Sequence, residues 1–176
     1  MQKITQLSKH MANLIAAGEV VERPASVVKE LVENAIDAGS TSISIEIENG
    51  GIAKIAVTDN GCGIEQDDVE TAFLRHATSK IHRESDLAAI ETMGFRGEAL
   101  AAISAVSKVT MQTKTADESI GTRIALEGGA VMDLSDAGCP TGTKITVCDL
   151  FFNTPARHKF LKKDSTEAAY VLNVCQ

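Results

Sequence analysis

The chain has 176 residues, 44% of them hydrophobic, which is enough to bury one core and fits a single domain. Its formal net charge of −7 argues against a surface that binds nucleic acid indiscriminately. The first ten residues lack the apolar core of a signal peptide, and no later run reaches the ~18 apolar residues of a membrane span. The four cysteines, Cys62, Cys139, Cys148 and Cys175, form no CxxC pair. We therefore expect a cytoplasmic protein with reduced thiols and no membrane contact.

Two helices are predicted at the start of the chain. The first runs from Ser8 to Ala17, and Gly18 is expected to stop it. The second begins around Pro24, which suits a first helical turn, and continues to Ala38 before Gly39 ends it.

A β-hairpin is predicted next. Isoleucines alternate with polar residues over 43–47, the segment Asn49-Gly50-Gly51 supplies turn residues, and Ile55 and Val57 resume the alternation. The second strand runs into a glycine loop at 59–64.

The remaining elements complete a mixed pattern of helices and strands. Helices are expected near Glu65–Leu74 and Glu98–Ala105, with a polar, irregular stretch between them. Four strands should follow at Val109–Thr113, Thr122–Leu126, Ala130–Leu134 and Thr143–Val147, and then helices at Pro155–Lys163 and Ser165–Cys175. This order predicts an α+β two-layer sandwich, a mostly antiparallel mixed sheet with helices on one face.

Glu30 and Asn34 lie one helical turn apart on the second predicted helix, so a carboxylate and an amide oxygen can point into one pocket. Mg²⁺ usually keeps waters and takes substrate phosphates, which makes the Asn34 oxygen a plausible sole protein ligand. Glu30 could then deprotonate a water for attack on a terminal phosphate. The alternative is that both are ordinary surface residues of a helix.

Asp59 ends an apolar strand, where its carboxylate could accept a hydrogen bond from the exocyclic amine of adenine. Gly61 and Gly63 would let the backbone pass close to a planar base. Taken alone, the tripeptide Asp-Asn-Gly is more typical of a simple turn.

Phosphate-binding segments are predicted at two further places. Gly94–Leu100 lies where a loop enters a helix expected to start at Gly97, and free backbone N–H groups there favour anions. Arg75–Lys80 offers hydroxyls and cations, although an exposed loop would look similar. No GxxxxGK[ST] motif occurs, so a P-loop is excluded. The cationic stretch Arg157–Lys163 is read as a solvated face or, alternatively, a nucleic-acid contact.

Six segments, in this order, resemble the N-terminal ATPase domain of the MutL DNA mismatch-repair proteins: Ala16–Pro24, Lys29–Gly39, Asp59–Ile64, Arg75–Lys80, Gly94–Leu100 and Phe151–Arg157. The match covers nearly the whole chain. It implies the fold shared with gyrase, the large heat-shock chaperone and histidine kinases, known as the GHKL or Bergerat ATPase fold. Residues 1–176 would form one such ATP-binding domain, a fragment ending before the family's second domain.

The resemblance also implies cofactors and residue roles. ATP and Mg²⁺ are the expected cofactors, with Glu30 as general base and Asn34 as magnesium ligand. Thr143 matches the last nucleotide-site motif and would lie beside Asp59. The implied nucleotide-binding residues are Asn34, Asp59, Gly61, Gly63, Thr78, Ser79, Lys80, Gly94, Phe95, Arg96, Gly97, Glu98, Ala99, Leu100 and Thr143.

By the same resemblance, the protein would dimerise on binding ATP, as a homodimer or with a paralogue, and relay mismatch recognition to later repair steps. Its implied partners are a mismatch-recognition protein, a nicking endonuclease, a helicase and, weakly, DNA through Arg96 or Arg157–Lys163. It would work at the nucleoid in a bacterium or in the nucleus of a eukaryote. Two alternatives remain: a nucleotide-gated binding module without turnover, because a lysine from the missing domain completes the family's site, and a gyrase-like topoisomerase ATPase subunit.

Overall fold

The computed structural model describes residues 3–75 and 98–176. The predicted nucleotide residues Thr78, Ser79, Lys80, Gly94, Phe95, Arg96 and Gly97 lie outside these ranges. Among the helices of the described ranges, none has the length and apolar character needed to cross a membrane.

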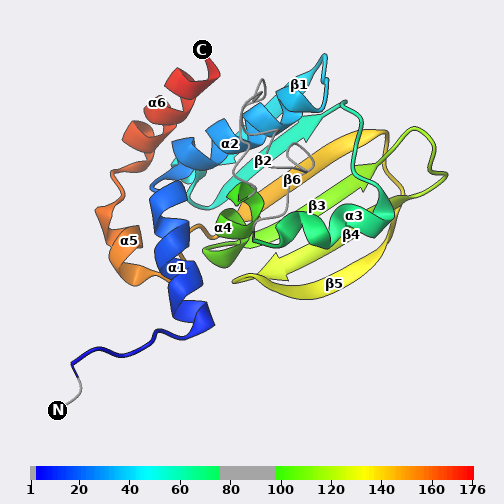
Figure 1. Cartoon of the computed structure of the whole chain (residues 1–176). Coiled ribbons are helices and arrows are strands. Elements are labelled where there is room, and N and C mark those ends of the chain that lie inside the picture. Colours follow the sequence, from blue (N-terminus) through cyan, green and yellow to red (C-terminus); the bar gives the residue numbers. More distant parts are fainter. Residues whose placement is uncertain (1–2, 76–97) are drawn as a thin grey trace, which may run out of the picture.

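Within the described ranges, six strands form one sheet (Figure 1). They are β1 (Ile43–Glu48), β2 (Lys54–Asp59), β3 (Lys108–Lys114), β4 (Gly121–Glu127), β5 (Ala130–Ala137) and β6 (Gly142–Cys148). Their order is β1-β2-β6-β3-β4-β5, and each pair of neighbours is antiparallel. The α+β class is therefore confirmed, but the sheet is antiparallel throughout the described strands rather than mixed. The last strand in sequence, β6, is inserted between β2 and β3.

The register aligns residues of the six strands in rows that cross the sheet, buried in the central strands and exposed in the edge strand β5. Two rows are apolar: Ile45, Val57, Ile145, Met111, Ile124 and Leu134, and then Ile47, Ile55, Val147, Val109, Leu126 and Val131. The next row, at the end of β2, is Ile43, Asp59, Thr143, Thr113, Thr122 and Asp136. We call this third set the polar row. It marks the point where the apolar core gives way to groups that can form hydrogen bonds.

The opposite face of the sheet is polar and carries ion pairs. Lys54 lies 3.9 Å from Glu46 and 3.7 Å from Glu48. Arg123 lies 2.9 Å from Asp133. Since strand side chains alternate between faces, this pattern leaves only one face for the helices to cover.

Helices α1 (Lys9–Val20), α2 (Pro24–Asp37) and α4 (Ala99–Ala105) lie over the core face (Figure 1). Contacts join α2 to β2, and α4 to β3 and β4. Further elements are the 3-10 turn η1 (Asn49–Gly51), α3 (Gln66–Val69), η2 (Thr71–Phe73), α5 (Pro155–Phe160) and α6 (Asp164–Cys175). Helix α6 packs on α2 and η1, outside the layer that covers the sheet.

Several predicted helix boundaries were wrong. Helix α5 ends at Phe160 rather than at Lys163, and larger differences concern α1 and the helix expected over 65–74. Helix α1 continues through Gly18 to Val20. Arg157 explains this, because its Nη1 donates to the carbonyl oxygens of Gly18 at 3.1 Å and Val21 at 3.4 Å, from 139 residues further along the chain. The helix expected over 65–74 divides into α3 and η2 instead, and α3 starts at Gln66, whose N–H donates to Glu118 at 2.8 Å.

Candidate functional site

Glu30 and Asn34 lie on α2 beside its buried stripe. Val27, Leu31 and Ala35 are buried against the sheet, whereas Glu30 and Asn34 are half-buried. Their spacing of one turn places them on the same flank of the helix, as the sequence predicts. Neither residue sits on the fully exposed face that the surface alternative requires.

Asp59 ends β2 and forms a turn with its own loop. Its Oδ1 accepts a hydrogen bond of 2.8 Å from the N–H of Gly61, the local bond expected of an aspartate in a turn. Within residues 3–75 and 98–176, the Asp59 side chain makes no other hydrogen bond. Its second oxygen, Oδ2, is therefore available as an acceptor. The turn and the base-reading roles are therefore compatible.

The loop after Asp59 is fastened to the C-terminal end of α2. The N–H of Cys62 donates to the carbonyl oxygen of Ala38 at 3.0 Å. Asn60 adds a second fastening, because its Oδ1 accepts from the N–H groups of Thr41 at 2.9 Å and Ser42 at 3.0 Å. Asn34 lies one turn before Ala38, so these bonds bring the predicted metal ligand and the predicted base reader to one corner. The sequence analysis did not predict this role for Asn60. The available indication was that asparagine side chains in turns often form hydrogen bonds with nearby backbone groups.

Gly61 and Gly63 are explained by packing within the protein. A Cβ on Gly61 would lie 2.7 Å from Cβ of Ala38, and Gly63 has φ of 75° and lies against the backbone of Lys114. Both glycines therefore shape the loop, and their contact with a base stays a prediction.

Thr143 lies in the polar row directly between Asp59 and Thr113. Its Oγ1 is 2.9 Å from Oγ1 of Thr113, a residue only 1% exposed. The Thr113 hydroxyl also accepts from the N–H of Ile64 at 2.9 Å and donates to the carbonyl oxygen of Gly142 at 3.0 Å. The predicted pairing of Thr143 with Asp59 is thus present at the level of strand register. Thr113 was not predicted, because its role depends on that register.

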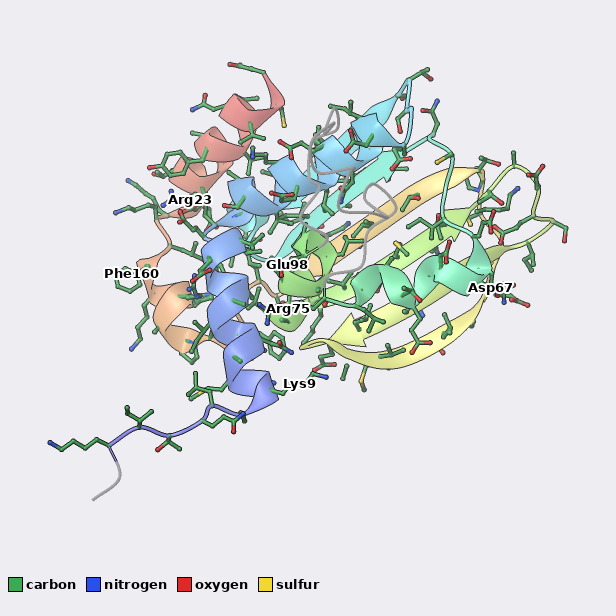
Figure 2. The ribbon with its side chains drawn as sticks, viewed as in Figure 1. Lys9, Arg23, Asp67, Arg75, Glu98 and Phe160 are labelled. Atoms are coloured by element: carbon green, nitrogen blue, oxygen red, sulfur yellow. The ribbon has the colours of Figure 1, made fainter. Side chains whose placement is uncertain are left out.

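The start of α4 holds the described part of the predicted phosphate segment. Glu98, Ala99 and Leu100 are half-buried there. The helix begins at Ala99, with Glu98 in the capping position, rather than at Gly97 as predicted. Glu98 Oε1 lies 3.5 Å from Nε of Arg75, and Figure 2 shows the two side chains near this helix.

The oxygen ligands predicted at this site suit magnesium better than a transition metal. In the described part of the chain, no group of three or more His, Cys, Asp or Glu side chains could hold a metal ion. An oxygen from Asn34, completed by phosphate oxygens and water, is a set of hard ligands of the kind Mg²⁺ accepts. The amide of Asn34 makes no side-chain hydrogen bond to another described residue, so its oxygen is available.

An apolar hollow of about 270 Å³ lies elsewhere, between α1 and the start of α5. It is lined by Met11, Leu14, Ile15, Thr154, Pro155, Ala156 and Arg157. Its described lining includes none of the residues predicted to bind nucleotide, although it includes Arg157, which was predicted as a possible DNA contact.

Comparison with known proteins agrees with this arrangement. Residues 22–130 match the family described as histidine kinase-, DNA gyrase B- and HSP90-like ATPase. This match spans more than half of the chain, so the chain belongs to that ATPase family.

Within the family, the chain is similar over nearly its whole length to MutL proteins. It is 60% identical over 174 residues to the DNA mismatch repair protein MutL of Caldanaerobacter subterraneus subsp. tengcongensis, covering 99% of this chain and 30% of that protein. It is 58% identical to MutL of Desulforamulus reducens, covering 97% of this chain and 27% of that protein. The chain thus spans less than a third of the length of these curated relatives.

Solved structures agree in fold. The MutL ATPase domain of Aquifex aeolicus complexed with ADP aligns with a TM-score of 0.71 and 38% identity, covering 89% of this chain and 54% of that one. The N-terminal domain of a DNA repair protein aligns with a TM-score of 0.77 and 30% identity, covering 93% of this chain and 47% of that one. The predicted GHKL ATPase fold is confirmed.

Proposed function

We propose that this chain is the Mg²⁺-dependent, ATP-binding and ATP-hydrolysing domain of a MutL-like DNA mismatch-repair protein. The observation that carries the proposal is the corner where Asp59 and Thr143, in the polar row, meet the C-terminal end of α2. Asn34 lies one turn before Ala38 and Glu30 one turn further back, so a base-reading acceptor is followed along α2 by an amide oxygen and then a carboxylate. The similarity to MutL ATPase domains, one of them complexed with ADP, supports ATP as the ligand.

In this proposal each residue has one role. Asp59 accepts the exocyclic amine of adenine through Oδ2, and Thr143 completes that end of the site. Asn34 would hold Mg²⁺, which supplies neutralisation of phosphate charge. Glu30 orients a water and takes its proton as the water attacks the terminal phosphate. The segments Thr78–Lys80 and Gly94–Leu100 bind the phosphates.

The wider role is inferred from the relatives. As a MutL-like protein, the full-length molecule would dimerise when ATP binds and pass the signal to a mismatch-recognition protein, a nicking endonuclease and a helicase. It would work on DNA at the nucleoid, since these relatives are bacterial mismatch-repair proteins. We propose residues 1–176 as one ATP-binding domain, followed in the full-length protein by the family's second domain. Arg157 is occupied by α1, so DNA contact is assigned to exposed cations such as Lys159, Lys162 and Lys163.

Two other functions remain as outcomes of experiment. A nucleotide-gated binding module would bind ATP through Asp59 without turnover. A gyrase-like topoisomerase subunit would share the ATP site, but the similarity to MutL over 99% of the chain favours mismatch repair.

The proposal is tested by binding of a non-hydrolysable ATP analogue in the presence and absence of Mg²⁺, measured by calorimetry. Asp59→Ala should abolish binding, because the amine loses its acceptor. Asp136→Ala is the matched control: it removes an exposed aspartate from the far end of the same row and should bind as the wild type does. Absence of binding by the wild-type chain, or equal binding by the Asp59 variant, would contradict the site.

A further inference from the structure

The hydroxyl of Thr113 has no capacity left beyond its three partners. A threonine hydroxyl has one proton to donate and two lone pairs that accept. The N–H of Ile64, at 2.9 Å, can only donate, and it takes one lone pair. The carbonyl oxygen of Gly142, at 3.0 Å, can only accept, and it takes the proton. What remains on Thr113 is a single lone pair.

The third partner is the hydroxyl of Thr143, at 2.9 Å. Because Thr113 has only a lone pair left, Thr143 must be the donor in this bond. The proton of Thr143 is thereby directed into the protein. Its lone pairs are what it offers to anything bound beside Asp59.

We propose that Thr113 is a positioning residue that makes the nucleotide site select an adenine base, by holding Thr143 as a hydrogen-bond acceptor. This inference rests on the proposed function. Asp59 Oδ2 is also an acceptor, so the side chains of Asp59 and Thr143 can both pair only with a hydrogen-bond donor on the ligand. Adenine presents an amine there, directly or through a water, whereas hypoxanthine and guanine present a carbonyl oxygen. An acceptor facing that oxygen would leave both groups unpaired, which costs affinity.

Thr113 also fixes the loop itself. The bond to Ile64 joins the end of the 59–64 loop to β3, while the fastening at Ala38 joins it to α2. At 1% exposure, Thr113 cannot contact a ligand. Its effect on selectivity must therefore pass through Thr143 and the loop.

The functional test compares ATP with inosine triphosphate, which carries a carbonyl where adenine carries the amine. Thr113→Val keeps the side-chain shape but frees the Thr143 hydroxyl to rotate and donate. The ratio of the two affinities should fall about tenfold in this variant, the loss expected when one buried hydrogen-bonding arrangement is released. Thr113→Ser, which keeps the hydroxyl, should restore the ratio.

The matched control is Thr122→Val, which alters the next buried threonine of the same row, on β4. It should leave the ratio unchanged. A Thr113→Val protein that weakens both nucleotides equally would show a structural role only and would overturn the proposal.

Neutron diffraction of the wild-type protein tests the proton direction without any variant or nucleotide. We expect the hydroxyl deuterium of Thr143 to point at Thr113, and the hydroxyl deuterium of Thr113 to point at the carbonyl oxygen of Gly142. Deuterium on Thr113 directed at Thr143 would overturn the proposal. A wild-type chain that binds neither nucleotide would overturn the proposed function, and with it the base selectivity, whereas the deuterium map would still decide which threonine donates.

Discussion

Glu30 is the residue on which turnover depends in the proposed mechanism. Replacing Glu30 by Ala removes the group that takes the proton from the attacking water, while the base and metal contacts stay in place. Turnover should therefore fall by about 100- to 10,000-fold, the usual contribution of a general base. Affinity for the ATP analogue should remain close to that of the wild type. Both quantities can be followed by phosphate release and calorimetry.

The control for this variant is Glu33→Ala on the same helix. Glu33 pairs with Lys29 at 3.3 Å, one turn away, and no catalytic role is assigned to it. Turnover should survive this change. If the wild-type chain binds ATP but shows no turnover to lose, the binding-module alternative holds for this chain.

At the scale of residues, helical spacing correctly predicted that Glu30 and Asn34 share one flank of α2, and strand alternation correctly predicted that Asp59 lies at the end of β2. Their roles in a nucleotide site came from the family resemblance and stay predictions. Thr113 could not be found in this way, because β3 and β6 are joined by hydrogen bonds between residues 30 positions apart. Its importance comes from three partners that only the folded sheet brings together.

Arg157 decides where the first helix ends. Its guanidinium group caps the last carbonyl oxygens of α1, so Arg157→Ala should leave these groups without a donor and lower the free energy of unfolding by about 1 to 3 kcal/mol. Urea denaturation measures this change. Lys159→Ala, at an exposed position of the same helix α5, should change stability far less. Equal stability of the Arg157 variant and the wild type would show that the cap is unimportant.

The helix α1 and the β1–β2 hairpin show what local sequence can and cannot predict. The hairpin was predicted correctly because alternation and the Asn-Gly-Gly turn are both local signals. The end of α1 was predicted wrongly because glycine normally ends a helix. Here Gly18 is buried beneath Arg157, a contact that a Cβ would block. Tertiary packing therefore overrode the local preference.

Glu118 connects the β3–β4 loop to α3 and makes this connection sensitive to acid. Backbone hydrogen bonds from Thr115 and Gln66 lower the pKa of Glu118 below its ordinary value of 4.5. A lowered pKa means that the carboxylate stabilises the fold above its unfolded pKa, and that this stabilisation is lost as the pH falls through the folded-state pKa. Glu118→Gln should therefore be less stable than the wild type at neutral pH, and the difference should shrink in acid.

Urea denaturation at neutral pH and at about pH 3 measures this difference directly. Glu70→Gln, at an exposed position near the same helix, is the control and should show no such pH-dependent gap. A constant difference between wild type and Glu118→Gln across this range would contradict the assignment.

At the scale of the whole molecule, the decisive feature is the place of β6 in the sheet. Its insertion between β2 and β3 puts Thr143 beside Asp59, although the two residues are 84 positions apart in the chain. Alternation predicts that each segment is a strand, but it carries no information on which strands are neighbours. The sequence could therefore indicate the strands and the fold class, while the strand order had to come from the resemblance or the structure.

The polar row also explains why one end of the molecule is suited to a ligand. Two apolar rows fill the space under α2 and α4, and the third row offers hydroxyls and carboxylates at the same level. A buried polar side chain is costly unless it is paired, and Thr113, buried in this row, has three partners for its hydroxyl. Among the described residues of this row, Asp59 Oδ2 and the lone pairs of Thr143 are the acceptors that the proposed function assigns to a nucleotide.

The most direct measurement is a crystal structure of the chain with Mg²⁺ and a non-hydrolysable ATP analogue. The proposed function predicts the exocyclic amine of adenine at about 2.9 Å from Oδ2 of Asp59, a normal hydrogen-bond distance. It also predicts the terminal phosphate on the side of the site that faces Glu30. An adenine bound away from Asp59, for example in the apolar hollow between α1 and α5, would contradict it.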